Sequence, residues 1–215
     1  MMLGYVYSLM PVMIDGLTIT LGVFFITLVL SIPLGIIVAI GRLSKIKPIS
    51  KVVELYIWVM RGTPLMLQIV FVFFGLPIVG LVFDRFTAVI IAFVLNYAAY
   101  FGEIFRGGME SIDKGQHEAA KVLGLSPYRT FIRIILPQMF KIVLPSIANE
   151  VITLVKDTSL IYVVGIGELL RAGKIASNRD VSLIPLAIVG LIYLALTAIF
   201  TGIFNKTEER YSYYE

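Results

Sequence analysis

The segment Gly115–Gln138, G-Q-H-E-A-A-K-V-L-G-L-S-P-Y-R-T-F-I-R-I-I-L-P-Q, is a charged island between two long apolar segments. Asp113, just before it, is a typical helix N-cap, and Gln116 follows three residues later, as in a capping box. Gly124 stands where a short helix would end, because glycine adopts the left-handed conformation of a helix C-terminus without steric cost. The pattern therefore predicts a short helix between Asp113 and Gly124.

The same segment contains a second helix start. Ser126 is a good N-cap, and Pro127 fits the first helical position. This second helix is predicted to continue into a membrane span. The first helix carries Glu118, Ala119 and Ala120, where small residues are flanked by charge. Such a helix suits insertion into a groove of another protein. The alternative is an ordinary loop that only caps its neighbouring helices.

The composition is that of a membrane protein. Of the 215 residues, 59% are hydrophobic and 15% are charged, which is typical of a polytopic membrane protein and not of a soluble domain. The absence of cysteine excludes disulfides and thiolate metal sites, and the single histidine, His117, excludes a histidine metal cluster. The formal charge of +4 comes from basic residues in short loops, so membrane topology explains it better than nucleic-acid binding.

Apolar runs of about 20 residues are long enough to cross a bilayer. We expect five transmembrane helices, at about residues 16–41, 64–80, 87–106, 140–160 and 184–204. Proline disfavours helix in the residue before it, so Arg61-Gly62-Thr63-Pro64 is expected to separate the second span from an interfacial segment at 52–60. The fold class is therefore all-α and polytopic, with residues 1–215 forming one membrane domain that contains no detectable internal repeat.

Basic residues predict the orientation of this domain. Arg42, Lys45 and Lys47 follow the first span, which places that loop in the cytoplasm and the N-terminus outside. The loop at 112–130 and the C-terminus are then cytoplasmic. The stretch 162–180 is too charged to cross the membrane, and we expect an amphipathic helix there on the outer surface. The chain is thus predicted to be a multi-pass protein of the cell membrane.

Polar side chains recur at helical spacing in two of the predicted spans. In the third span they are Asn96, Tyr100 and Glu103; in the fourth they are Glu150, Thr153 and Asp157, with Asn149 and Lys156 alongside. Ionisable groups inside a membrane usually face a protein interior or an aqueous path. The two stripes therefore predict a lined substrate pathway. The alternative is that these groups only hydrogen-bond one helix to another, with Glu103 paired to Arg106 and Asp157 paired to Lys156.

The break at Arg61–Pro64 adds Arg61 and Thr63 to the predicted pathway, because a broken membrane helix lets backbone groups face a ligand or act as a hinge. A simple interfacial kink is the alternative. No phosphate loop is expected: in Arg171-Ala172-Gly173-Lys174-Ile175 the residue after the lysine is not Ser or Thr. The chain is therefore predicted to bind no cofactor and no metal and to catalyse no reaction itself.

The charged segment resembles the EAA loop of ABC-transporter permeases, which runs E-A-A, three residues, G, nine residues, I-x-L-P. The matching residues are Glu118, Ala119, Ala120, Gly124, Ile134, Leu136 and Pro137. In that family the loop is the coupling helix, which docks on the ATP-binding subunit. The resemblance implies an ATPase-coupling role for Gln116, Glu118, Ala119, Ala120, Gly124 and Pro127.

Further stretches resemble permeases of polar amino-acid ABC importers, the histidine/glutamine/arginine permease family. They are Arg61–Leu65 with Gln68, Ala99-Tyr100 with Glu103 and Arg106-Gly107-Gly108, Lys114-Gly115-Gln116, and Lys156–Leu160. The resemblance implies a type I importer permease with five spans, paired with a second permease subunit; a homodimer is favoured and a heterodimer is left open. It also implies an ATPase subunit that holds ATP and magnesium, an external amino-acid-binding protein, and surrounding lipid.

The substrate class follows from charge. Acidic groups outnumber basic ones along the polar stripes, which favours a cationic amino acid over other polar amino acids. The expected function is ATP-driven import of such an amino acid by alternating access. The alternatives are an ABC permease for another small solute and, less favoured, a secondary transporter driven by an ion gradient, whose inverted repeats are missing here.

Overall fold

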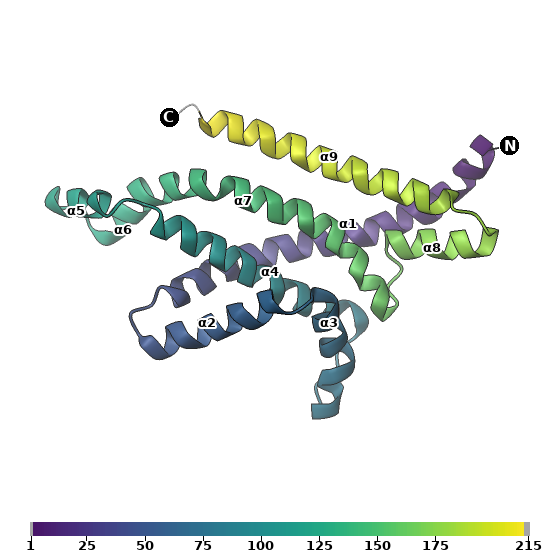
Figure 1. Ribbon diagram of the computed structural model, residues 1–215, viewed down its shortest axis with the longest axis horizontal. Coiled ribbons are helices and arrows are strands. Elements are labelled where there is room, and N and C mark those ends of the chain that lie inside the picture. Colours follow the sequence, from purple (N-terminus) through teal and green to yellow (C-terminus); the bar gives the residue numbers. More distant parts are fainter. Residues whose placement is uncertain (1, 213–215) are drawn as a thin grey trace.

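The computed structural model describes residues 2–212, and every regular element in this part of the chain is helical (Figure 1). The long helices are α1 (Met2–Arg42), α4 (Arg85–Glu110), α7 (Leu136–Asp157) and α9 (Ile184–Ser212). The shorter ones are α2 (Lys47–Gly62), α3 (Leu65–Val70), α5 (Lys114–Val122), α6 (Pro127–Thr130) and α8 (Leu169–Asp180). Two π-helical turns, η1 (Phe71–Gly75) and η3 (Phe131–Ile135), and two 3-10 helices, η2 (Leu76–Val79) and η4 (Thr158–Val164), complete the described elements.

Four single helices within residues 2–212 are long and apolar enough to cross a membrane: Gly4–Arg42, Arg85–Glu110, Pro127–Val164 and Ile184–Tyr211. A fifth candidate is the pair Lys47–Gly62 and Leu65–Val79, which bends by 106° between its halves. The bend coincides with the break expected at Arg61–Pro64. The first span differs from its expected start at residue 16, because α1 is already helical from Met2.

The expected second span over 64–80 is not one regular helix. It begins as α3, passes through the π-helical turn η1 and ends as the 3-10 helix η2. Pro77 lacks a backbone donor, and Gly80, at φ +87°, ends the helix in the left-handed region. These two residues therefore account for the 3-10 helix and its end.

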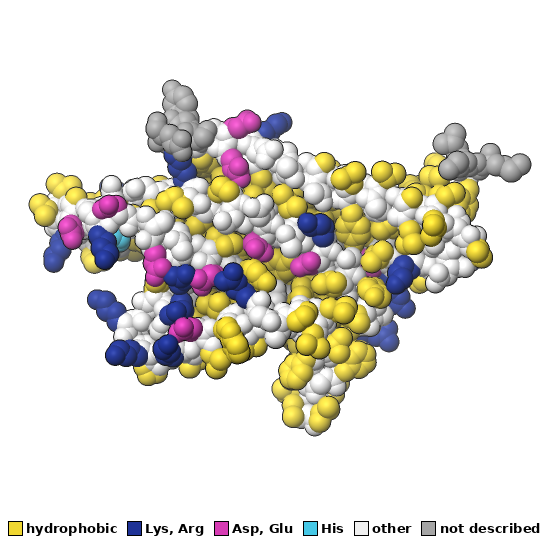
Figure 2. Space-filling view, in the orientation of Figure 1, with side chains coloured by type: hydrophobic (Ala, Val, Ile, Leu, Met, Phe, Trp, Pro, Cys, Tyr) yellow, Lys and Arg dark blue, Asp and Glu magenta, His cyan; other side chains and the backbone are white. Residues whose placement is uncertain are grey.

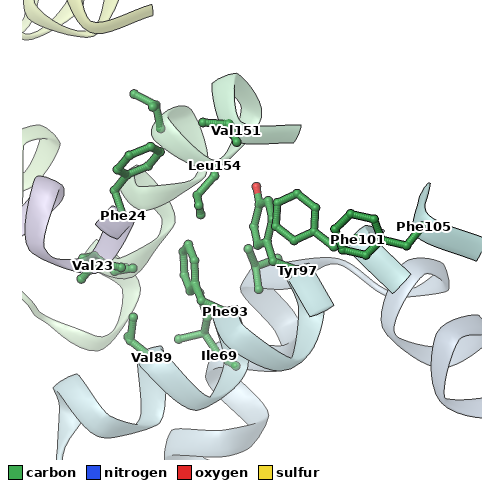
Figure 3. Packing of buried hydrophobic residues seen from close by; sticks show 14 of the residues in the cluster. Val23, Phe24, Ile69, Val89, Phe93, Tyr97, Phe101, Phe105, Val151 and Leu154 are labelled. Carbon is green, nitrogen blue, oxygen red and sulfur yellow. The ribbon is translucent and has the colours of Figure 1, made fainter. Parts of the chain in front are cut away.

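The core lies where α1 and α4 cross. A Cβ atom at Gly102 would lie 2.5 Å from Cγ1 of Val38, and one at Gly35 would lie 2.7 Å from Cβ of Phe101. The two helix backbones therefore approach as closely as small residues allow, as is usual in membrane bundles. Figure 3 shows Phe93 of α4 packed among the buried side chains of this core.

The charged segment forms the two expected short helices. The side chain of Asp113 accepts a hydrogen bond from the backbone N–H of Gly115, at 2.6 Å, and begins α5. Gly124 has φ +69°, and Pro127 is the first residue of α6. Because α6 is a single turn that passes through η3 into α7, this segment is continuous with the membrane-spanning helix.

The stretch 162–180 contains one regular α-helix, α8, which packs between α1 and α9. Its N-cap, Glu168, is fully buried and accepts hydrogen bonds from the backbone N–H groups of Leu170 and Arg171, each at 2.6 Å. The hydroxyl of Tyr193 in α9 donates a third, at 3.2 Å. Burial raises the pKa of the Glu168 carboxyl, although these hydrogen bonds act in the opposite direction. This buried carboxyl ties α8 to the membrane helices.

Candidate substrate cavity

A cavity of about 490 Å³ lies where the α2–α3 break meets α4 and the second half of α7. We call it the acidic cavity, after Glu150 and Asp157. The predicted pathway residues that line it are Arg61, Thr63, Asn96, Tyr100, Glu150, Thr153 and Asp157. The remaining lining residues are Gly62, Pro64, Leu65, Tyr97 and Leu160. The two polar stripes and the helix break therefore face one space.

Three residues of the predicted pathway lie elsewhere. Glu103 lines a second cavity of about 470 Å³, which we call the ion-pair cavity; its charged residues are Arg42, Glu54, Arg61, Glu103 and Arg106. Lys156 is exposed and lines a groove between α7, α8 and α9. Asn149 is exposed on α7 and lines neither of these cavities.

Hydrogen bonds from two amides hold the α2–α3 break in place. Nε2 of Gln68 donates to the carbonyl of Met60 at 2.9 Å and to Oγ1 of Thr63 at 2.8 Å. Nδ2 of Asn96 donates to the same Met60 carbonyl at 2.9 Å and to Oε1 of Gln68 at 3.0 Å. Because the last carbonyls of a helix lack partners within the helix, these side chains satisfy groups that the break exposes. Asn96 therefore supports the wall of the cavity that it lines.

The two carboxylates of the acidic cavity are held differently. Oδ2 of Asp157 accepts a hydrogen bond from the hydroxyl of Tyr97, at 2.8 Å, and Tyr97 is only 2% exposed. Glu150 is half-buried and makes no hydrogen bond or salt bridge within the described part of the chain. Glu150 is therefore the carboxylate that is available to a ligand.

Of the two ion pairs considered in the sequence analysis, the structure contains one. Glu103 accepts hydrogen bonds from Nε and Nη2 of Arg106, as the structural alternative expected. The alternative pairing of Asp157 with Lys156 is not found: no salt bridge joins them, Asp157 takes its hydrogen bond from Tyr97, and Lys156 is exposed and lines another groove. The phase of α7 separates these two adjacent side chains.

Two residues of this site were not predicted from the sequence. Tyr97 directly follows Asn96 and lies off the spacing of the stripe, so its contact with α7 left no periodic signal. Gln68 belongs to a stretch that resembles the family, yet nothing local showed that its amide reaches back to α2.

The predicted coupling residues lie at the opposite end of α4 from Asp84 and Arg85 (Figure 1). Gln116, Glu118 and Ala119 are exposed, as are Gly124 and Pro127, whereas Ala120 is buried. Exposed apolar side chains extend the same surface: Val122 is 88%, Leu123 75% and Tyr128 75% exposed. An apolar surface of this kind, rimmed by charge, is typical of a protein interface.

Fold and site together define a class: an all-helical membrane protein with a broken helix and a charged cavity among its spans, the arrangement of a transport subunit. The family described as "Binding-protein-dependent transport system inner membrane component" matches residues 31–213. The chain belongs to this family.

Several relatives are similar over nearly the whole chain. The arginine transport system permease protein ArtQ of Bacillus subtilis is 40% identical over 93% of this chain and 92% of its own. The glutamine transport system permease protein GlnP of Escherichia coli is 34% identical over 95% of each chain. The L-cystine transport system permease protein TcyB of Bacillus subtilis is 32% identical over 96% of this chain and 89% of its own.

Two solved structures share the fold. The crystal structure of an amino acid ABC transporter with histidines superposes with a TM-score of 0.88 at 34% identity and covers 97% of each chain. An inward-facing form of the MetNI methionine ABC transporter superposes with a TM-score of 0.75 and covers 95% of this chain and 98% of that one. At 18% identity the second likeness concerns the fold alone.

Proposed function

We propose that this chain is the permease subunit of an ATP-driven importer that moves basic amino acids into the cytoplasm by alternating access. The acidic cavity carries the proposal, because it contains two carboxylates and one guanidinium among polar and aromatic side chains. Buried charge is costly unless it is paired, so such a cavity favours a ligand that adds positive charge. The similarity to an arginine permease supports the same substrate class.

The carboxylate and amino groups of the substrate need partners as well. Thr153 and Tyr100 offer hydroxyl groups to the cavity, and Glu150 offers the carboxylate for a cationic group. Asp157 is already hydrogen-bonded, so its role is to keep negative charge in the cavity.

Energy for transport comes, in this proposal, from a separate ATPase that holds ATP and magnesium, while the permease itself holds neither. The exposed surface of α5 and α6 docks on that subunit, and η3 passes its movement into α7. An external binding protein delivers the amino acid, and a second permease subunit, a like copy being favoured, completes the pore. The N-terminus and α8 then lie outside, with the C-terminus in the cytoplasm.

Substituting Glu150 tests the substrate class. In proteoliposomes that contain the whole importer, Glu150→Gln is expected to reduce L-arginine uptake roughly tenfold or more, since a hydrogen bond to a charged group contributes about 1.5–3 kcal/mol. Uptake of L-glutamine is expected to change little. Glu208→Gln, at the far end of α9, is the matched control. Equal loss of both substrates would contradict charge matching and favour a permease for another small solute.

A further inference from the structure

Arg61 occupies a special position between the two cavities. It lies in the last turn of α2, directly before the break, and it lines both the acidic cavity and the ion-pair cavity. Its guanidinium carbon lies 5.2 Å from the centre of the Tyr100 ring. Along α4, Asn96 and Glu103 are separated by roughly 10 Å at 1.5 Å per residue, with Tyr100 between them. Arg61 therefore lies at the boundary between the cavities.

The other carboxylates around this boundary already have partners. In the ion-pair cavity, Glu103 is paired with Arg106, and Glu54 lies 3.5 Å from Arg42. In the acidic cavity, Asp157 is hydrogen-bonded by Tyr97. Glu150 has no such partner within residues 2–212, although Arg61 lines the same cavity.

The guanidinium of Arg61 is held loosely. Within the described residues it makes a cation–π contact with Tyr100 and no hydrogen bond or salt bridge. It lines one cavity together with Glu150 and the other together with Glu103. By contrast, the backbone next to Arg61 is fixed, because the side-chain amides of Gln68 and Asn96 donate hydrogen bonds to the carbonyl of Met60. A fixed backbone with a free cationic side chain suits a counter-ion that can move away when another cation arrives.

We propose that Arg61 is a displaceable counter-ion, which compensates Glu150 in the empty cavity and withdraws toward the ion-pair cavity when a cationic substrate enters. The proposal rests on the proposed function, since it assigns Arg61 the role of a specificity-determining residue in that same site. A cationic side chain replaces the charge that Arg61 withdraws, so Glu150 stays compensated. A neutral amino acid cannot do so and leaves Arg61 in place. Arg61 thus competes with the substrate for Glu150.

Binding measurements separate this role from a direct one. In the purified importer without nucleotide, Arg61→Gln is expected to tighten L-arginine binding about tenfold, because the competitor is gone, and to leave L-glutamine binding unchanged. Arg61→Lys keeps the charge and is expected to bind L-arginine nearly as the unaltered protein does. Lys156→Gln is the matched control, because it removes a cation beside Asp157 from outside the acidic cavity. If Arg61 instead held the substrate carboxylate, Arg61→Gln would weaken the binding of both amino acids, and the proposal would be overturned.

A second measurement needs no substrate and therefore separates failure of this proposal from failure of the proposed function. The melting temperature of the empty importer is compared for Arg61→Gln, Glu150→Gln and the double variant. The fall caused by Arg61→Gln is expected to disappear when Glu150 is also neutral, because no uncompensated carboxylate is left. Additive falls would overturn the counter-ion role even if L-arginine is the substrate. If the two melting-temperature changes are not additive but the importer binds no L-arginine, the counter-ion role stands and the substrate class is refuted.

Discussion

Single side chains decide which carboxylate of the acidic cavity can meet a ligand. The hydroxyl of Tyr97, an almost fully buried residue of the cavity lining, donates to Asp157 and fixes that carboxylate against α4. Glu150, two helical turns earlier on α7, has no comparable donor among the described residues. The carboxylate of Asp157 is therefore held by a protein donor, whereas that of Glu150 is available to a ligand.

Removing one oxygen atom tests this difference. Tyr97→Phe leaves Asp157 without its donor in a buried setting, at a cost of about 1–3 kcal/mol. Uptake of L-arginine is expected to fall roughly tenfold, while the amount of importer in the membrane stays near normal. Tyr162→Phe, at an exposed tyrosine outside the cavity, is the control for the loss of a hydroxyl. Unchanged uptake in Tyr97→Phe would show that Asp157 needs no positioning.

At the scale of an element, the α5–α6 segment contains a sharp bend at Gly124. Gly124 adopts φ +69°, which residues other than glycine and asparagine rarely adopt, and its N–H donates to the carbonyl of Lys121 at 3.0 Å. The bend presents Val122 and Leu123 to the outside while α6 continues into α7. A docked partner could therefore move α7 through this bend.

Proline at position 124 is expected to uncouple transport from ATP hydrolysis. Proline cannot adopt a positive φ and lacks the N–H that bonds Lys121. We expect Gly124→Pro to insert normally and to lose uptake more than tenfold, with either futile hydrolysis or an ATPase that no longer copurifies. Gly124→Asn tolerates the left-handed region and is expected to keep most uptake. Normal uptake by the proline variant would argue against a coupling role.

At the scale of the whole molecule, charge is unevenly distributed along the bundle. Figure 2 shows basic side chains gathered around α5 and the start of α2, with hydrophobic side chains spread over the middle of the molecule. By the positive-inside rule, we propose that this end faces the cytoplasm. Helix α8, which carries the exposed Lys174, lies at the opposite end, near the start of α9 (Figure 1).

Labelling of single cysteines checks this orientation without background, because the sequence contains no cysteine. Lys47→Cys and Lys121→Cys are expected to react with an impermeant maleimide only when the cytoplasmic side is open. Lys174→Cys is expected to react from the outside in intact cells. Reaction of Lys174→Cys from the inside alone would refute the five-span orientation.

The sequence by itself determined the features that depend on near neighbours in the chain. Asp113, Ser126 and Pro127 begin their helices through groups one to three residues away, so a local pattern was enough to predict them. The apolar runs predicted a helical membrane protein, because the hydrocarbon core accepts little else. The spacing of Glu150, Thr153 and Asp157 likewise showed one polar face before its partner helix was known.

Only the tertiary structure decided which residues on these faces meet. The hydrogen bond of Tyr97 to Asp157 joins residues 60 positions apart, and that of Asn96 to Met60 joins residues 36 apart. Such contacts depend on where two helices cross and how each is rotated about its axis. Between α4 and α7, the close approach of Gly108 to Val143 contributes to this geometry. This is why Asp157 pairs with Tyr97 and not with Lys156, and why Arg61 lies between two cavities; helical spacing could specify neither.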